Sequence, residues 1–242
     1  MKAWYQNNHI WQEADTLLEA LGWKDFTQGR IAVVGAGGKT STIFRLAKEF
    51  AAGNRRVVIT TTTHMLRELG VLATTVEEVR ELLLQQPIVI AGRTAKDGKI
   101  ASLEAAEIMA LSHIADMVLI EADGSKHLPL KVPAAQEPVI PVGTDRVLVV
   151  AGLSGMGGIL SECCHRAELV QALLQVTPEH RIGPEDVALM IQKGYLEKHL
   201  LPNGYQGIVI LNQAEGGKKE AGRKIAELLA PYPCVMTQLK EE

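Results

Sequence analysis

Short runs of β-branched and aliphatic residues recur along this chain, and most are followed by a polar or glycine-rich turn and a stretch with helical spacing. Such runs are typical of strands buried on both faces of a parallel sheet. The predicted strands cover residues 31–34, 57–61, 117–121, 146–151, 207–212 and 234–237, and the predicted helices cover residues 40–52, 76–86, 103–113 and 218–229. This alternation predicts one α/β domain over residues 1–242, with a doubly wound, mostly parallel sheet flanked by helices.

The segment before the first predicted strand has its own apolar pattern. Ile10, Ala14 and Leu17 lie on one helical stripe within residues 10–21, which predicts a helix there. We therefore treat residues 1–26 as an N-terminal helical extension.

Two connections carry turn signals. Residues 87–92 and 99–100 flank an Asp97-Gly98 turn and predict a small hairpin insertion. Residues 124–143 contain four prolines, which oppose regular structure. This proline-rich loop is either a lid or a long surface connection. Thr75 is the expected N-cap of the helix over residues 76–86.

Composition narrows the possible functions. The formal net charge is −3, so no basic field is available for nucleic acid, and we expect no nucleic-acid partner. The apolar runs are much shorter than the about 20 residues that span a bilayer, and we expect no membrane association. The three cysteines make no disulfide framework, and the first residues lack the apolar core of a signal peptide. Both features favour a cytoplasmic location.

The most informative segment is a glycine-rich turn between the strand over residues 31–34 and the helix that follows. Glycines expose backbone N–H groups without a Cβ, and the helix N-terminus adds partial positive charge, so such a turn binds phosphates. Lys39 can reach the terminal phosphates, and Thr40 offers a hydroxyl to Mg²⁺. The residues expected to contact the nucleotide are Gly35, Ala36, Gly37, Gly38, Lys39, Thr40 and Ser41.

This loop is the short form of the Walker A pattern, G-x-x-G-K-T, because Val33 stands where the longer form has glycine. A dinucleotide-binding loop needs a third glycine where this chain has Thr40. A nucleoside triphosphate, ATP or GTP, is therefore the better interpretation. A tight strand-to-helix turn with a solvated Lys39 is the alternative.

Two acids end the strand over residues 117–121. Glu121 is its last residue and Asp123 follows closely, at the position where P-loop proteins hold Mg²⁺ or its water shell. Either carboxylate is a candidate metal ligand beside Thr40, and the other would orient a water. Lys39, Glu121 and Asp123 are the predicted catalytic residues. The alternative is that both acids are only solvated.

Threonines 60–63 follow the neighbouring strand. A threonine of this group can ligate Mg²⁺, for which Thr62 is the candidate, and the loop over residues 60–63 can respond to the γ-phosphate. Strand alternation sends half of these side chains elsewhere, and the alternative is that their hydroxyls bond to the neighbouring backbone.

The segment from Asn212 to Glu215 has the outline of the base-reading motif N-K-x-D, with Gln for Lys and Glu for Asp. Asn212 and Glu215 are therefore candidate nucleotide-binding residues, and a carboxylate at position 215 can accept hydrogen bonds from a guanine edge. A plain strand-to-helix loop is the alternative.

Two further segments have candidate chemistry. The glycine-rich loop over residues 152–158 can receive a second substrate. Cys163-Cys164-His165 is a candidate metal-binding segment. Adjacent cysteines rarely ligate one ion well, however, so an incidental thiol pair is the favoured interpretation.

In their order and spacing, residues 34–41, 60–65, 120–126 and 211–213 resemble the motifs of the YqeC-type selenium-dependent hydroxylase accessory family. The resemblance covers nearly the whole chain from Thr27. It implies a P-loop NTPase-like fold and a role in supplying a selenium-containing cofactor to molybdenum hydroxylases. The implied partners are such a hydroxylase or its cofactor-maturation enzymes.

Two shorter segments resemble different protein families, and these resemblances imply different nucleotide bases. The phosphate loop is similar to that of Mur-type ligases, which implies ATP. The Glu121 to Gly124 and Asn212 to Glu215 segments are similar to those of GTPase-type maturation factors, which implies GTP.

Three functions fit these residues. The first is a Mg²⁺-dependent nucleoside triphosphatase that serves molybdenum hydroxylase maturation. The second is a non-hydrolysing carrier or chaperone for a nucleotide-bearing molybdenum cofactor. The third is an ATP-dependent kinase or ligase whose small acceptor would lie near Ser125, Lys126, His127 and Lys131.

Overall fold

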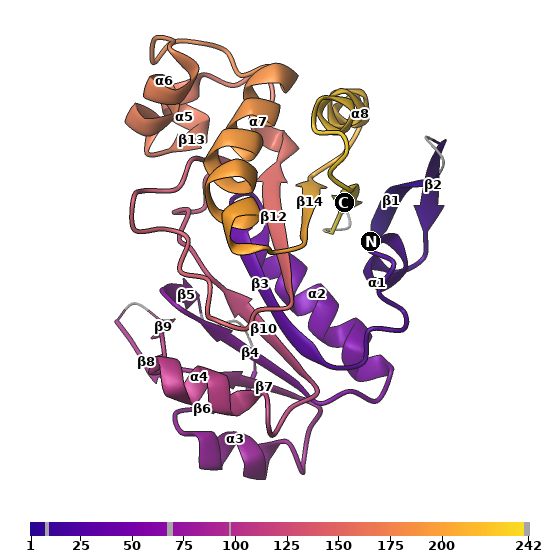
Figure 1. Cartoon of the computed structure of the whole chain (residues 1–242), viewed down its shortest axis with the longest axis vertical. Coiled ribbons are helices and arrows are strands. Elements are labelled where there is room, and N and C mark those ends of the chain that lie inside the picture. The colour runs from indigo at the N-terminus through magenta and orange to yellow at the C-terminus, as the bar shows by residue number, and fades with distance from the viewer. Residues whose placement is uncertain (8–9, 67–69, 97, 240–242) are drawn as a thin grey trace.

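A ten-stranded sheet runs through the molecule in the computed structural model, which describes residues 1–7, 10–66, 70–96 and 98–239 (Figure 1). Its strands, in spatial order, are β2 (Ile10–Ala14), β1 (Lys2–Asn7), β15 (Cys234–Gln238), β14 (Gly207–Asn212), β12 (Arg146–Gly152), β3 (Gly29–Gly35), β10 (Met117–Glu121), β4 (Val57–Thr61), β7 (Ile88–Ala91) and β6 (Leu72–Ala73). From β15 to β6 every pairing is parallel, and β1 and β2 add an antiparallel edge. The predicted mostly parallel α/β sheet is confirmed.

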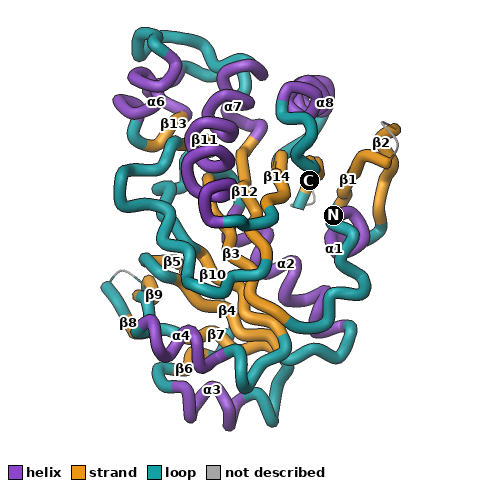
Figure 2. Tube along the Cα trace, viewed as in Figure 1, coloured by secondary structure: helices purple, strands orange, loops and turns teal. Residues whose placement is uncertain are grey.

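Helices cover both faces of the sheet (Figures 1 and 2). The α-helices are α1 (Leu17–Ala20), α2 (Lys39–Ala52), α3 (Val76–Leu82), α4 (Ala105–Leu111), α5 (Leu160–Cys163), α6 (Ala167–Leu174), α7 (Pro184–Ile191) and α8 (Lys218–Leu228). A π-helix, η2 (Gln192–Leu200), continues α7, and η1 (Leu153–Gly155) and η3 (Leu201–Asn203) are short 3₁₀ turns.

The central strands have apolar residues on both faces. On β3, Ile31 and Val33 pack against α1 and α2, whereas Ala32 and Val34 face the cluster formed with α7 and α8. This two-sided burial explains why the central strands read as continuous apolar runs. The helix predicted over residues 40–52 is confirmed as α2, and Thr75 caps α3 by accepting a hydrogen bond from the Glu78 amide.

The register brings the proposed site residues to one edge. Val33 of β3 pairs with Glu121 of β10 on one side and with Leu148 of β12 on the other. The loop that leaves β3 therefore emerges beside the ends of both neighbouring strands. Ligand sites of open parallel sheets lie at this carboxyl edge.

The helix predicted over residues 10–21 is wrong in its first half. Residues Ile10–Ala14 form β2 and pair with β1, and α1 begins only after Thr16, whose side chain caps it. Of the three residues on the proposed helical stripe, Ala14 and Leu17 are buried, but Ile10 is 64% exposed, so the stripe does not form one continuous core-facing helix surface. Pairing of β1 with β15 satisfies an otherwise open sheet edge, and this long-range contact outweighs local helical spacing.

The predicted hairpin is placed differently. Residues Ile88–Ala91 form β7, which pairs in parallel with β4 in the main sheet. A hairpin does follow, between β8 (Arg93–Thr94) and β9 (Lys99–Ala101), and β9 also pairs with β5 (His64–Leu66). Asp97, part of the predicted turn, lies outside the described residues.

Two further segments differ from the sequence expectation. The proline-rich loop contains a two-residue strand, β11 (Leu130–Lys131), which pairs with β13 (Cys164–His165). The sequence pattern also missed α6, α7 and η2 between β12 and β14. Within the described residues no helix has the length and apolar character needed to cross a bilayer.

The packing of α2 makes a testable prediction. Phe50 is 2% exposed and lies in the cluster between α2 and the sheet, so Phe50→Ala should lower the free energy of unfolding by about 3–5 kcal/mol. Leu84→Ala is the matched control, because Leu84 is 84% exposed, and its effect should stay within about 0.5 kcal/mol. Urea denaturation measures both. Similar losses in the two variants would show that α2 does not pack as described.

Candidate functional site

The turn between β3 and α2 has a backbone that only glycine adopts without strain. Gly37 has φ +78° and Gly38 has φ +132°. A Cβ at Gly37 would overlap the Gly152 backbone, and one at Gly38 would overlap the side-chain amide of Asn212. Other loops thus lie directly against the turn, which is built for close backbone approach.

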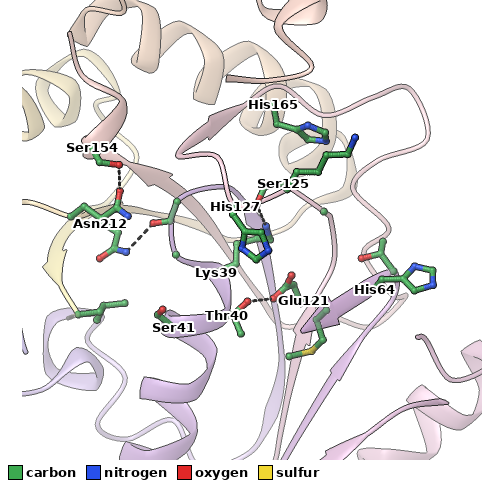
Figure 3. Close-up of a pocket in the computed structure, with 18 of the residues that line it drawn as sticks. Lys39, Thr40, Ser41, His64, Glu121, Ser125, His127, Ser154, His165 and Asn212 are labelled. Carbon is green, nitrogen blue, oxygen red and sulfur yellow. Dashed lines mark hydrogen bonds between the residues drawn. The ribbon is translucent and has the colours of Figure 1, made fainter. Parts of the chain in front are cut away.

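Asn212 holds this turn from the end of β14. Its Nδ2 donates to the Gly37 carbonyl at 2.9 Å (Figure 3), and its Oδ1 accepts from the Thr237 hydroxyl at 2.9 Å. The structure therefore brings Asn212 to the glycine turn, and the amide is occupied by the loop itself. The sequence suggested that Asn212 contacts the nucleotide base, whereas in the structure its side-chain amide contacts the Gly37 carbonyl.

Lys39, the first residue of α2, is 4% exposed. Its Nζ donates to the Gly35 carbonyl at 2.9 Å and to the Ser125 hydroxyl at 3.0 Å, and it lies 3.5 Å from Asp123 Oδ1. A lysine ammonium in this position is held over the turn by neutral and acidic oxygens. Phosphate oxygens are a stronger partner for it than the carbonyl and hydroxyl.

Thr40 and Glu121 form the floor of the site. The Thr40 hydroxyl donates to Glu121 Oε2 at 2.7 Å (Figure 3). Burial raises the pKa of Glu121, and the Lys39 ammonium and the Thr40 hydrogen bond oppose that rise. A nearby divalent cation would favour the ionised carboxylate.

These two oxygens suit Mg²⁺, which accepts one or two protein oxygens and completes its shell with phosphate and water. The described residues contain no group of three or more acidic, histidine or cysteine side chains that could hold a metal by themselves. A magnesium ion here would need phosphate oxygens, as it does in nucleotide sites.

Asp123 lies below the turn instead of lining the cavity. Its side chain is fully buried, and Oδ2 accepts from the Gly35 amide at 3.0 Å and from the Tyr195 hydroxyl at 3.2 Å. Lys131 Nζ lies 3.2 Å away. This geometry does not support the predicted metal role of Asp123, and favours Glu121 for it.

Thr62 also lies away from the cavity. Its hydroxyl donates to the Val139 carbonyl at 2.8 Å, and the Thr61 hydroxyl donates to the Glu121 carbonyl at 2.8 Å. The geometry thus supports the alternative in which threonine hydroxyls bond to backbone, and does not support Thr62 as a metal ligand. Thr63, the last of the four threonines in this predicted loop, lines the cavity.

A cavity of about 770 Å³ opens above these groups. Gly37, Gly38, Lys39, Thr40, Ser41, Glu121, Asn212 and Glu215 are the predicted site residues that line it. Gly35 and Ala36 lie behind the turn, where the Ala36 amide donates to the Val150 carbonyl. The size lies within the range of small-molecule sites.

The opposite wall comes from the proline-rich loop and β13. Ser125, Lys126 and His127 of the loop line it, together with His165 and Arg166. The first three were already candidates for an acceptor site. Nothing in the local sequence marked Arg166 or its partner Glu137, because only tertiary structure brings residues 137 and 166 together.

Charged side chains connect this wall to the glycine turn. Lys131 Nζ lies 2.7 Å from Glu137 Oε2, and Arg166 donates to both oxygens of Glu137. Burial of Glu137 would raise its pKa, but the hydrogen bonds from Arg166 and Lys131 outweigh this and lower the pKa to about 2. The carboxylate therefore stays ionised at neutral pH.

A family model described as YqeC protein matches residues 31–168, which include the glycine turn between β3 and α2, Glu121 and the proline-rich loop. The chain belongs to the YqeC family. A relative named Uncharacterized protein YqeC, from Escherichia coli (strain K12), is 33% identical over 192 residues, which are 76% of this chain and 75% of that protein. The family resemblance noted from the motifs is confirmed.

Two solved structures resemble this chain with low sequence identity and low TM-scores. The hydrogenase maturation factor HypB from Archaeoglobus fulgidus is 10% identical with a TM-score of 0.42, over 89% of this chain and 84% of HypB. FlhF complexed with GMPPNP/Mg(2+) is 14% identical with a TM-score of 0.44, over 88% of this chain and 69% of FlhF. The assignment of the fold class rests on the sheet topology described above.

The glycine turn is tested by Gly37→Ala. Gly204→Ala is the matched control, because Gly204 has φ +68° with no atom within 4 Å of a new Cβ. Left-handed strain should cost each variant about 1–2 kcal/mol, and overlap with Gly152 should cost Gly37→Ala about 1–3 kcal/mol more. Urea denaturation compares them. Equal losses would contradict the close contact between the two loops.

The low pKa of Glu137 predicts a pH dependence. Its ordinary value of 4.5 falls to about 2 in the folded protein, so its stabilising contribution is complete above pH 4.5 and disappears as the pH falls through about 2. The stability difference between wild type and Glu137→Gln should therefore shrink over this window in acid denaturation. Glu162→Gln, at an exposed glutamate, is the control. A difference independent of pH would refute the ion pairing.

Proposed function

We propose that this cavity binds a nucleoside triphosphate together with Mg²⁺, and that the protein is a nucleoside triphosphatase. One observation carries the proposal. The left-handed glycine turn, the Lys39 ammonium and the Thr40–Glu121 pair all lie at the same end of a single cavity. Such a convergence of amides, ammonium and hard oxygens suits a polyphosphate and its cation.

In this proposal the amides of residues 37–40 and the Lys39 ammonium neutralise the charge of the β- and γ-phosphates. Thr40 and Glu121 hold Mg²⁺, which when bound withdraws charge from the phosphate oxygens. Asn212 keeps the turn in shape through the Gly37 carbonyl. Lys39 gives up its bonds to Gly35 and Ser125 when it turns to phosphate.

Glu215 is the proposed base-reading residue, and GTP is the proposed nucleotide. Its carboxylate lines the cavity, and a carboxylate is an acceptor of hydrogen bonds only. The Watson–Crick edge of guanine offers two adjacent N–H donors, whereas that of adenine offers one. ATP is the alternative outcome of the same titration.

We also propose that nucleotide hydrolysis serves the maturation of selenium-dependent molybdenum hydroxylases. The motif resemblance described above supports this role, because it is the resemblance to the YqeC-type family that implies it, and the chain belongs to the YqeC family. The direct partners would be a molybdenum hydroxylase or an enzyme that matures its cofactor.

Isothermal titration calorimetry with ATP, GTP and their non-hydrolysable analogues, with and without Mg²⁺, tests the site. Lys39→Ala should weaken triphosphate binding at least about tenfold, the loss expected for one charge-assisted hydrogen bond. Lys48→Ala is the matched control, since Lys48 is exposed on the same helix, and it should bind like wild type.

Thermal denaturation of both variants shows whether each is folded. Unchanged affinity in a folded Lys39→Ala would overturn the site. If wild type binds ATP or GTP but releases no inorganic phosphate from it, the result would instead favour the non-hydrolysing carrier.

A further inference from the structure

The wall opposite the phosphate turn is lined by side chains that the proposed nucleotide site does not use. Lys126, His127, His165 and Arg166 line this part of the cavity. In Figure 3, His127 lies between His165 and the Thr40–Glu121 pair. Lys126 and His127 are exposed, and neither has a structural role in the contacts described above.

A chain of buried and half-buried charges leads to this wall. Its members alternate in sign, from Lys39 through Asp123, Lys131 and Glu137 to Arg166. The three cations exceed the two carboxylates by one positive charge. Both end members, Lys39 and Arg166, line the cavity, and so does Glu137, whose two oxygens already accept hydrogen bonds from Arg166.

The backbone of the wall is strained. Lys126, His127 and Arg166 have φ values of +46°, +62° and +58°. Such angles are uncommon for residues other than glycine and cost free energy, and they concentrate at ligand sites where the surrounding structure holds them. The fold thus holds three potentially cationic residues in unfavourable conformations around one end of the cavity.

The wall adjoins the position proposed for the terminal phosphate. Ser125, which directly precedes Lys126 and His127, accepts a hydrogen bond from Lys39. A ligand bound by Lys126 and His127 would therefore lie beside the group that Lys39 holds.

We propose that Lys126, His127, His165 and Arg166 form a second subsite, which binds a small molecule through a carboxylate or phosphate group next to the nucleotide. This inference rests on the proposed function, because it assigns the phosphate turn to the nucleotide. Because the alternating chain has a cation at each end, the nucleotide phosphate would face Lys39 and the second ligand's anionic group would face Arg166. Glu137 keeps the Arg166 guanidinium in place, and the guanidinium N–H groups that Glu137 does not use can donate to the ligand.

His165 offers a spectroscopic readout. Burial lowers its pKa, and the nearby cations Arg166, Lys131 and Lys126 lower it further, against the opposing effect of the Glu137 carboxylate. An anion bound at the subsite would favour the protonated ring and raise this pKa.

Inorganic phosphate is the probe, added to the full chain saturated with Mg²⁺ and a non-hydrolysable GTP or ATP analogue. We expect calorimetry to detect one phosphate and NMR titration of the His165 ring to show a raised pKa. Lys126→Met should weaken phosphate about tenfold, with nucleotide affinity unchanged. Lys198→Met, at an exposed lysine of η2 outside the cavity, should behave like wild type. Arg166→Met, if it folds, should weaken phosphate as well.

The outcomes separate the two proposals. Absence of phosphate binding to the nucleotide-loaded protein, or equal binding by wild type and Lys126→Met, would overturn the subsite while leaving the nucleotide site intact. Loss of nucleotide affinity in Lys126→Met would show that this wall holds the nucleotide itself, and would also overturn the subsite. If wild type binds no nucleotide, the proposed function fails. The subsite would still be supported if the free protein binds phosphate and Lys126→Met weakens that binding whereas Lys39→Ala does not.

Discussion

The buried carboxylate of Asp123 connects the parts of the site that come from distant segments. It accepts hydrogen bonds from the Gly35 amide and the Tyr195 hydroxyl and lies between the ammonium groups of Lys39 and Lys131. A carboxylate removed from water is costly unless it is paired and hydrogen-bonded. Because its partners come from the phosphate turn, the proline-rich loop and the π-helix, satisfying this one charge fixes their mutual positions. Burial and the neighbouring Asp123 raise the pKa of Tyr195 well above its ordinary value, so its hydroxyl remains a donor.

This arrangement links the two ends of the cavity. Lys39 Nζ lies 3.5 Å from Asp123 Oδ1, and in the proposed nucleotide complex the ammonium turns toward phosphate. Asp123 would then depend more on Lys131, which is shared with Glu137 and through it with Arg166. Occupancy of the phosphate turn and the charge at the opposite wall are therefore physically connected through adjacent ion pairs. A protein that must sense both a nucleotide and a second anion has a use for such a connection.

The sequence was sufficient for features that depend on local chemistry. Strands such as β3 were predictable because both of their faces are apolar, and the glycine turn was predictable because only glycine allows its backbone. The β1–β2 hairpin was not, since the helical stripe through Ile10 and Ala14 cannot reveal that β15 needs a partner. Asp123 and Glu121 look alike at the end of β10, yet only the folded structure shows that one lies beneath the turn and the other faces the cavity. Glu137 and Arg166 carried no local signal, because their pairing depends on where β11 and β13 meet.

The most direct test of this account is a crystal structure of the protein with Mg²⁺ and a non-hydrolysable GTP or ATP analogue. The account predicts phosphate oxygens within hydrogen-bond distance of the amides of residues 37–40, the Lys39 ammonium turned from Ser125 to those oxygens, and the metal beside the Thr40 hydroxyl. Nucleotide bound elsewhere on the chain, or phosphates that leave Lys39 on Ser125 and Gly35, would contradict it.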